Sequence, residues 1–363
     1  MSSMTQSGMD VERAVIGGVD CHDQTHRFAA LDALGRRLGD AEFPATAAGY
    51  VRAEQWLRCW GTVRMVGVES TGSYGAGLTR HLQAVGLTVV EVNQPHPHAR
   101  SRRGKSDAID AEMAARKVLS GEVTTVPKDT TGVVESIRQL TVARAGAVKA
   151  RTAALVQLGQ LLVTAPAPLR EQVDAKTLLG RAAQCTRLRP DLTRLGDPVQ
   201  ASKLALRSVA RRITDLNHSI DELDEGLSPL VAKTAPRTLQ RLGVGTQHAA
   251  QLLITAGANI SRLRNEAAFA HLCGVDPIPA SSGKTVRHRL NHGGDRAANS
   301  SLHMITVVRL RYCEQTRTYL QRRMNEGKTK REAMRCLKRY LARELFRTIT
   351  ADLKIMSGPL DGL

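Results

Sequence analysis

Seven apolar residues in the middle of the chain recur at alternating intervals of three and four, and this spacing constrains the fold more than any other feature. They are Leu206, Val209, Ile213, Leu216, Ile220, Leu223 and Leu227. An alternation sustained over three heptads predicts a long α-helix with one apolar seam. A partner helix must cover the seam, and it belongs either to the same chain, as an intramolecular helical hairpin, or to a second copy, as a dimerising coiled coil.

A second set of apolar residues with helical spacing precedes this helix. It consists of Ile137, Leu140, Val148, Leu155, Leu158 and Leu162, and it ends at the proline-rich stretch Ala165–Pro168. Proline lacks the backbone N–H that a helix interior needs, so this stretch predicts the end of the first helix. We therefore expect residues 130–235 to form a helical coiled-coil connector that serves as a scaffold.

The N-terminal part of the chain shows short apolar runs instead, broken by glycine and aspartate. The predicted order is strand Ala14–Val19, strand Phe28–Leu31, strand Ala41–Phe43, helix Tyr50–Trp60, strand Met65–Val68, helix Leu78–Val85, strand Thr88–Val92 and helix Ser106–Leu119. This succession predicts an α/β domain with a mixed sheet over residues 13–125. Residues 1–12 are polar, and we expect them to be disordered.

The last part, residues 236–363, is predicted to be mostly helical. The turn Leu242–Thr246 resembles a helix–hairpin–helix, whose backbone amides can meet a phosphate, although glycines in such a turn more often serve the backbone conformation alone. After Cys273 we expect an irregular loop through Pro277–Arg296, which contains Ser281, Ser282 and Gly283. Basic helices are predicted from there to about residue 354.

The net charge is +18, from 52 basic and 34 acidic residues, and it is concentrated towards the C-terminus. Residues 1–120 carry 14 basic and 13 acidic groups, whereas residues 241–363 carry 21 and nine. A polyanionic partner explains such a gradient, because each neutralised phosphate releases counterions and adds affinity. Aromatic residues make up only 3% of the chain, so stacking on many bases is not the expected mode of recognition.

Several protein classes are excluded by composition. No apolar run approaches the roughly 18 residues of a membrane span, and the N-terminus shows no signal peptide, which predicts a cytoplasmic protein. The six cysteines are scattered without a CxxC pair, which argues against a zinc ribbon and a disulfide scaffold.

Four carboxylates occupy positions from which they can meet. Asp20 ends the first predicted strand, and Glu69 ends a later one. Asp107 and Asp110 lie three apart at the start of a predicted helix, so both project from one helical face. Such a cluster repels itself unless divalent cations lie in it, and Mg²⁺ held by carboxylates and substrate phosphates is the usual arrangement for phosphoryl transfer.

Each residue alone also has a simpler interpretation. An aspartate after a strand or before a helix is most often a turn or capping residue, and Asp23 and Asp32 are expected to be of this kind. Cys21 is expected to be a small buried residue rather than a nucleophile. The histidines near these motifs, His22, His26, His96 and His98, show no spacing typical of metal ligands. The four carboxylates together, in this order of strands and helix, favour a metal site.

The motifs that contain these carboxylates resemble the RuvC-like DEDD domain of a family of bacterial insertion-sequence transposases, the IS110 family. They are Gly-Val-Asp-Cys-His-Asp-Gln-Thr-His (18–26), Glu-Ser-Thr-Gly-Ser-Tyr (69–74) and Lys-Ser-Asp-Ala-Ile-Asp-Ala (105–111). The block from Cys273 to Arg296 is similar to the second domain of that family. The middle helices match only in length and character.

The resemblance implies an RNase H-like DEDD domain, a coiled-coil connector and a C-terminal domain with a catalytic serine. Asp20, Glu69, Asp107 and Asp110 would bind Mg²⁺, which we expect as two ions, since a pair can stabilise both the attacking and the leaving oxygen. Ser282 would be the nucleophile, with Ser281 as its neighbour. The serine would form a covalent bond to a DNA phosphate before the strand is passed on. The resemblance also implies guidance by a structured RNA that pairs with donor and target DNA, a bacterial nucleoid-associated location, and an oligomer from dimer to tetramer in which different protomers complete one site.

The residues around the serine are suited to holding phosphates rather than to deprotonating a hydroxyl. The expected nucleic-acid-binding cations are Lys105, Lys284, Arg287, Arg289 and Arg296. His288 and His292 lie near the serine in sequence and are candidates for a proton shuttle. Two alternatives stay open: a hydrolytic nuclease of Holliday-junction-resolvase type, in which water replaces Ser282, and a non-catalytic nucleic-acid-binding protein, which the intact set of carboxylates disfavours.

Overall fold

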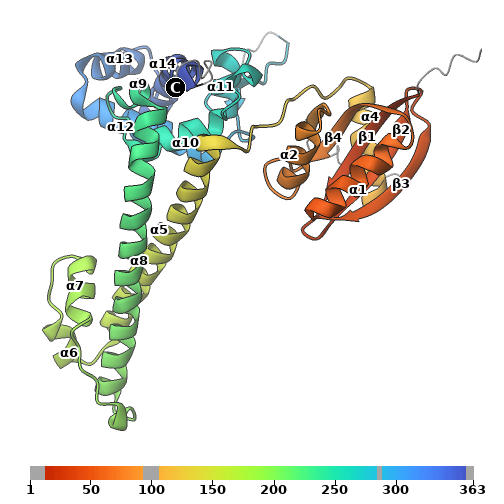
Figure 1. Cartoon of the computed structure of the whole chain (residues 1–363). Coiled ribbons are helices and arrows are strands. Elements are labelled where there is room, and N and C mark those ends of the chain that lie inside the picture. Colours follow the sequence, from red (N-terminus) through yellow and green to blue (C-terminus); the bar gives the residue numbers. More distant parts are fainter. Residues whose placement is uncertain (1–12, 93–105, 284–287, 357–363) are drawn as a thin grey trace, which may run out of the picture. The chain divides into compact units, whose positions relative to one another are not determined.

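The computed structural model describes residues 13–92, 106–283 and 288–356 (Figure 1). It contains two compact units, residues 1–130 and residues 131–363. The first unit contains β1 (Ala14–Cys21), β2 (Thr25–Asp32), β3 (Arg37–Pro44), α1 (Ala47–Arg58), β4 (Thr62–Glu69), α2 (Ala76–Ala84), β5 (Val89–Val92) and α4 (Asp107–Leu119). The predicted elements of this part are confirmed in type and order, with ends that differ by a few residues. The expectation for residues 1–12 concerns residues outside the described ranges.

The five strands form one mixed sheet in the order β3-β2-β1-β4-β5. Strands β1, β2 and β3 pair antiparallel, whereas β4 is parallel to both β1 and β5. This topology fits an RNase H-like α/β domain. The carboxyl ends of β1 and β4 therefore meet at the same edge of the sheet.

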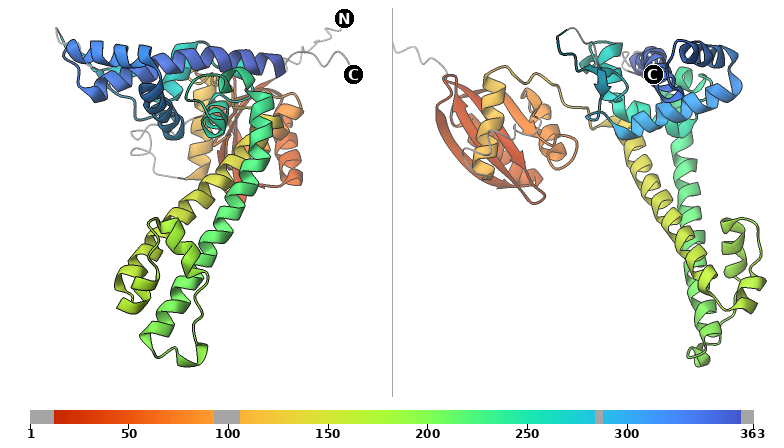
Figure 2. Two further views of the ribbon diagram at one scale, coloured as in Figure 1. Left: turned by 90° about the vertical axis from the view of Figure 1, so that its left-hand side faces the viewer. Right: turned by 180° about the vertical axis from the view of Figure 1, so that it is seen from behind.

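The two faces of this sheet are covered by different helices (Figure 2). On one face α1 and α2 pack on a core that includes Val15, Val19 and Val68. On the other face α4 packs on β4 and β5 through Ala114 and Val118. Since successive side chains of a strand alternate between the faces, the even-numbered residues of β1 and, after a register shift, the odd-numbered residues of β4 from Met65 onward lie on the α4 side.

Helix α4 lies unusually close to β1, and glycine permits this approach. A Cβ atom placed on Gly18 would meet the carbonyl oxygen of Ala111 at 2.2 Å and the amide nitrogen of Ala115 at 2.3 Å. Both are backbone atoms, so no side-chain rotation can relieve the overlap. Gly18 therefore fixes the distance between α4 and the strand that ends at Asp20.

We expect Gly18→Ala to destabilise the first unit by about 3 kcal/mol, at the upper end of the cost of overpacking. Gly17→Ala is the matched control, because its Cβ would point to the opposite face and meet only side-chain atoms of Val66 and Leu57 at 3.2–3.3 Å. Both tryptophans, Trp56 and Trp60, belong to this unit, so their fluorescence during urea unfolding reports its stability. Equal losses in the two variants would contradict the assignment.

The regular structure described in the second unit consists of helices and one small two-stranded ribbon. It contains α5 (Gly132–Thr164), α6 (Ala167–Gln172), α7 (Leu178–Cys185), α8 (Pro198–Thr234), α9 (Pro236–Leu239), α10 (Thr246–Ala256), α11 (Glu266–Leu272), β6 (Pro277–Pro279), β7 (His288–Leu290), α12 (Arg296–Tyr312), α13 (Glu314–Asn325) and α14 (Lys330–Met356), with short 3₁₀ turns at Leu192–Arg194 and Ile260–Arg262. Helices α5 and α8 run side by side along most of their length (Figure 1). Helices α6 and α7 pack at one end of this pair, and α9–α14 gather at the other (Figure 2).

The apolar seam of α8 is covered within the chain. Leu206, Val209 and Ile213 share a core with Leu158 and Leu162 of α5. Nearer the other end Leu227 packs in a core with Ile137 and with the C-terminal helices. Of the two alternatives, the intramolecular hairpin is the one observed, and the connector and the C-terminal helices form one unit by their contacts.

One local feature of the C-terminal unit departs from the sequence-based expectation. The stretch after Cys273 is not wholly irregular, because β6 and β7 pair antiparallel with Ile278 opposite Arg289. Three-residue strands with prolines carry too little apolar alternation to be recognised from sequence.

The turn before α10 contains Gly243 with φ of +83°, a conformation that glycine adopts without steric cost. This agrees with the expectation that a glycine of this turn serves the backbone conformation.

The described helices include none whose length and apolar character would let it cross a membrane.

Candidate active site

The first carboxylate, Asp20, lies at the end of the central strand β1 and faces α4. Its side chain is about 11% exposed. The glycine two residues earlier, Gly18, is on the same face and brings α4 against the strand. The sequence thus places Asp20 directly beneath the first turn of that helix.

The second carboxylate, Glu69, ends the neighbouring strand β4 at the same level. Val19 pairs with Val68 in the parallel register, so the next residues, Asp20 and Glu69, lie side by side. Glu69 is 9% exposed. The following residue, Ser70, has φ of +54°, in the left-handed region that non-glycine residues seldom adopt. This turn ends β4 immediately after the carboxylate and leads the chain towards α2, and such strain is most often found at functional sites.

The third and fourth carboxylates come from the first turn of α4 and differ in exposure. Asp110 is buried at 3% exposure, whereas the side chain of Asp107 is about 51% exposed. Both lie at the helix N-terminus, where the partial positive charge of the helix dipole favours carboxylates. The two residues project from neighbouring positions of one face: Asp110 is buried, whereas the more exposed Asp107 reaches His22 next to the end of β1.

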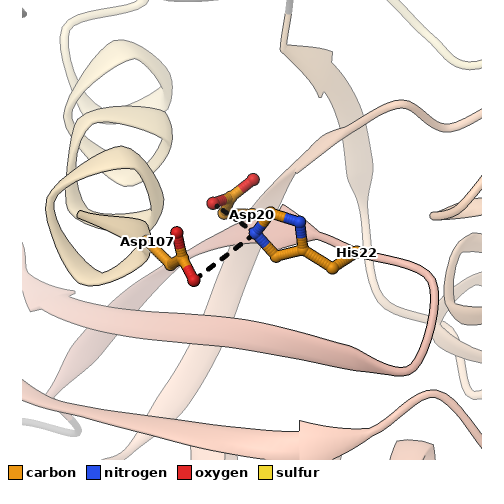
Figure 3. A group of neighbouring side chains, drawn as sticks. All are labelled: Asp20, His22 and Asp107. Carbon is orange, nitrogen blue, oxygen red and sulfur yellow. Dashed lines mark ion pairs between the residues drawn. The ribbon is translucent and has the colours of Figure 1, made fainter. Parts of the chain in front are cut away.

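An imidazole lies between two of these carboxylates (Figure 3). His22 Nε2 is 3.2 Å from Asp20 Oδ2 and 3.5 Å from Asp107 Oδ2. One ligand atom from each of these three residues lies within 4.8 Å of the others. A protonated imidazole here would neutralise part of the negative charge of both carboxylates.

The electrostatics of the cluster show that its charges interact. Burial raises the pKa of the Asp20 carboxyl above its ordinary value, and the charges of Asp110 and Asp107 raise it further, whereas His22 lowers it. The buried thiol of Cys21 has a raised pKa for the same reasons, burial first and then the charges of Asp20 and Glu69. Cys21 is therefore a protonated, buried residue, in agreement with its expected role, and not a nucleophile.

This donor set fits a divalent cation. Carboxylate oxygens are the ligands that Mg²⁺ and Mn²⁺ take in proteins, and imidazole accompanies them at several metals. Burial is the main cause of the raised pKa of Asp20, and the neighbouring charges of Asp110 and Asp107 add a like-charge repulsion to it. A bound cation would remove this repulsion.

Asp32, one of the two aspartates expected to be turn or capping residues, has a structural role. It is buried, and its carboxylate accepts hydrogen bonds from the backbone amides of Leu34 and Arg36 and from Arg36 Nε. It is a turn residue as expected, although it lies inside rather than on the surface. These bonds lower its pKa below the ordinary value.

The proposed nucleophile, Ser282, lies in the second unit, between the two strands of the β6–β7 ribbon. Ser281 and Ser282 are both exposed. Gly283 follows with φ of +57°, so the chain turns directly after the pair in a conformation that favours glycine. A hydroxyl at such a turn is accessible to a large substrate.

The expected cations are only partly described by the structure. Arg289 on β7 and Arg296 at the start of α12 line a common groove, and His288 and His292 line it too. Lys105, Lys284 and Arg287 lie outside the described residues.

Sequence reasoning missed two groups of residues in these sites. His22 shows no metal-ligand spacing in the sequence, yet its interval of two from Asp20, just past the end of β1, places the two side chains on one face. Tyr319 and Tyr340, which lie in the groove near β7, are far apart in sequence and carry no local signal.

Comparison with protein-family models gives two matches. Residues 17–165 match the DEDD transposase model named for IS110, and residues 237–321 match the model of transposases of the IS116/IS110/IS902 family. The first segment contains all four carboxylates, and the second contains Ser282, Arg289 and Arg296. No curated protein matches the chain.

Proposed function

The chain belongs to the IS110 family of transposases, enzymes that cut and rejoin DNA, and on this premise we propose that it does so through a covalent bond between DNA and Ser282. The single observation that carries the metal-assisted part of this proposal is the cluster of Asp20, His22 and Asp107 beneath α4. The exposed serine pair at the turn of the β6–β7 ribbon supports the covalent part.

In the proposed reaction Ser282 Oγ attacks a phosphorus atom of the DNA backbone. A new Oγ–P bond forms as the bond from phosphorus to one deoxyribose oxygen breaks, and the serine proton is transferred to a base. The leaving oxygen takes up a proton and becomes a hydroxyl. Rejoining reverses these steps, with the hydroxyl of another DNA end attacking phosphorus and displacing Ser282, so no external energy source is needed.

We propose that Asp20, Glu69, Asp107 and Asp110 hold Mg²⁺, which when bound supplies Lewis-acid stabilisation of negative charge on the phosphate oxygens. Burial holds Asp20, Glu69 and Asp110 in place, and the close packing on Gly18 brings α4, which carries Asp107 and Asp110, against β1. His22, when protonated, offsets their charge in the absence of a cation. Arg289 and Arg296 contribute charge-assisted contacts to phosphates.

A structured RNA partner and assembly of the chain into dimers or tetramers complete the proposal. The concentration of basic residues in the last third supports binding of a second polyanion besides DNA. If base pairing with such an RNA selects the DNA, sequence choice does not require side chains that read bases.

The test is a covalent-trapping assay with the full chain, end-labelled DNA, the transcript of the element's flanking region and Mg²⁺. The proposal predicts a labelled protein–DNA band that survives denaturant and disappears when EDTA replaces Mg²⁺. Mg²⁺-dependent cutting without such a band would instead assign the chain to hydrolytic nucleases. Binding without cutting, unaffected by EDTA, would assign it to non-catalytic DNA-binding proteins.

A further inference from the structure

A groove of about 1030 Å³ lies in the second unit among β7, α12, α13 and α14. Nine arginine and lysine side chains line it, against two carboxylates, those of Asp276 and Glu332. Both carboxylates are engaged by neighbours within the unit. Asp276 contacts His271 Nδ1 at 2.9 Å, and Glu332 accepts hydrogen bonds from the amide and hydroxyl of Thr329.

Most of the cations in this groove form no ion pair with a carboxylate in the described part of the chain. Arg322, Arg323 and Arg343 form ion pairs with glutamates. The six others form none with a described carboxylate, and they are Arg289, Arg296, Lys328, Arg335, Lys338 and Arg339. Such an excess of unneutralised positive charge fits a polyanion with several phosphates.

The pKa of Lys338, a half-buried residue of the groove, also reflects the excess of positive charge. Its pKa is lowered, first by burial and then by the charge of Arg335. The ammonium donates a hydrogen bond to Asn299 Oδ1 at 2.7 Å, and Asn299 in turn donates to the carbonyl oxygen of Gly274 at 2.8 Å. The carboxylate of Glu332 acts on Arg335 and Lys328, but one carboxylate cannot neutralise all these cations, and a phosphate near Lys338 and Arg335 would offset the repulsion between them.

Two tyrosines face each other in this basic groove. The rings of Tyr319 and Tyr340 are 5.5 Å apart and nearly perpendicular. The guanidinium of Arg322 lies 5.2 Å from the ring centre of Tyr319, and that of Arg343 lies 6.0 Å from the ring centre of Tyr340. Tyr340 is 54% exposed. Exposed aromatic rings within a basic groove are the combination by which single-stranded nucleic acids are bound.

We propose that this groove binds a single-stranded segment of DNA or RNA, with its phosphates on the unpartnered cations and an unpaired base stacked on Tyr340. The proposal rests on the proposed function for the presence of nucleic acid and adds the form in which it is bound. A duplex keeps its bases stacked inside and cannot offer one to Tyr340, so the ligand is single-stranded. Because β7 belongs to the ribbon that carries Ser282 between its strands, the groove would guide a strand that leaves the cutting site.

The experiment measures binding of the full chain to fluorescein-labelled 12-nucleotide probes by anisotropy in EDTA, where cutting is absent. The probes are single-stranded DNA, RNA of the same sequence, and the corresponding duplex DNA. Tyr340→Ala should weaken single-strand binding about tenfold or more, since stacking of one base contributes about 1–3 kcal/mol, whereas Tyr340→Phe should retain it. Tyr312→Ala is the matched control, because Tyr312 is also exposed and lies beneath Arg311 but does not line the groove.

Weakened binding of DNA alone, of RNA alone or of both would support the proposal and identify the strand. Arg335→Ala combined with Arg339→Ala should also reduce the salt dependence of single-strand binding by about 0.7 in slope for each lost contact. Single-strand affinity within twofold of wild type in Tyr340→Ala would overturn the proposal, as would an equal loss for the duplex. Circular dichroism confirms that each variant is folded. Because no chemistry occurs in EDTA, a failure here is independent of whether Ser282 forms an adduct.

Discussion

Replacing Ser282 by alanine is expected to abolish the protein–DNA adduct, reducing it at least a hundredfold, because the variant has no hydroxyl with which to attack phosphorus. Replacing Ser281 should leave the adduct in place. The two residues are exposed neighbours directly before Gly283, so each substitution removes one oxygen atom from an exposed side chain. Ser281→Ala is therefore the matched control for the effects of Ser282→Ala on folding and on DNA binding.

The measurement compares the denaturant-resistant band of the two variants with that of the wild type, all with Mg²⁺ and the same labelled DNA. Proteolysis of the wild-type adduct and mass spectrometry of the nucleotide-bearing peptide then locate the bond. An adduct lost in Ser281→Ala and kept in Ser282→Ala would move the nucleophile by one residue. An adduct that both variants retain would place it elsewhere in the chain.

The sequence predicts the first unit well because local patterns determine most of it. Strand ends can be located from apolar runs. Because successive side chains of a strand alternate between the two faces of the sheet, Asp20 and Glu69 fall on one face once their strands are paired in parallel. The pairing itself is not local, so the approach of α4 through Gly18 becomes evident only in the structure. The same alternation places His22 on the face of Asp20, but its role becomes evident only when the face covered by α4 is known to carry the site.

The second unit shows where such prediction ends. The heptad seam of α8 predicts a partner helix but not whether that helix belongs to the same chain, because α5 and another copy would bury the seam equally well. The basic groove depends on how α12, α13 and α14 fold against β7. No interval in the sequence joins Tyr319 to Tyr340, which meet only through this packing.

Replacing Asp20 by asparagine is expected to abolish DNA cutting while making the metal-free first unit more stable. Loss of a cation ligand removes several kcal/mol of transition-state stabilisation, equivalent to roughly a thousandfold in rate or more. Asparagine is nearly isosteric but uncharged, so it also removes the repulsion from Asp107 and Asp110. A buried carboxylate with only a packing role would instead destabilise the fold when replaced.

The direction in which the stability of the first unit changes with pH distinguishes a repelled cation ligand from a carboxylate that only packs in the core. Because the folded-state pKa of Asp20 is raised, the folded chain holds its proton more tightly than the unfolded chain. Stability therefore falls as the pH rises from the ordinary carboxyl pKa through the raised one, and this fall should be absent in Asp20→Asn. Asp32 is the matched control: its lowered pKa gives stability that is lost as the pH falls, so Asp32→Asn should destabilise at neutral pH.

Addition of Mg²⁺ completes the comparison, with unfolding of the first unit followed by the fluorescence of Trp56 and Trp60. A cation that binds only the folded state raises the unfolding midpoint in proportion to the logarithm of its concentration. We expect this rise in the wild type and in Asp32→Asn, and its loss in Asp20→Asn. If Mg²⁺ stabilised Asp20→Asn as much as the wild type, the cation would bind elsewhere, and the four carboxylates would have to act on DNA without it.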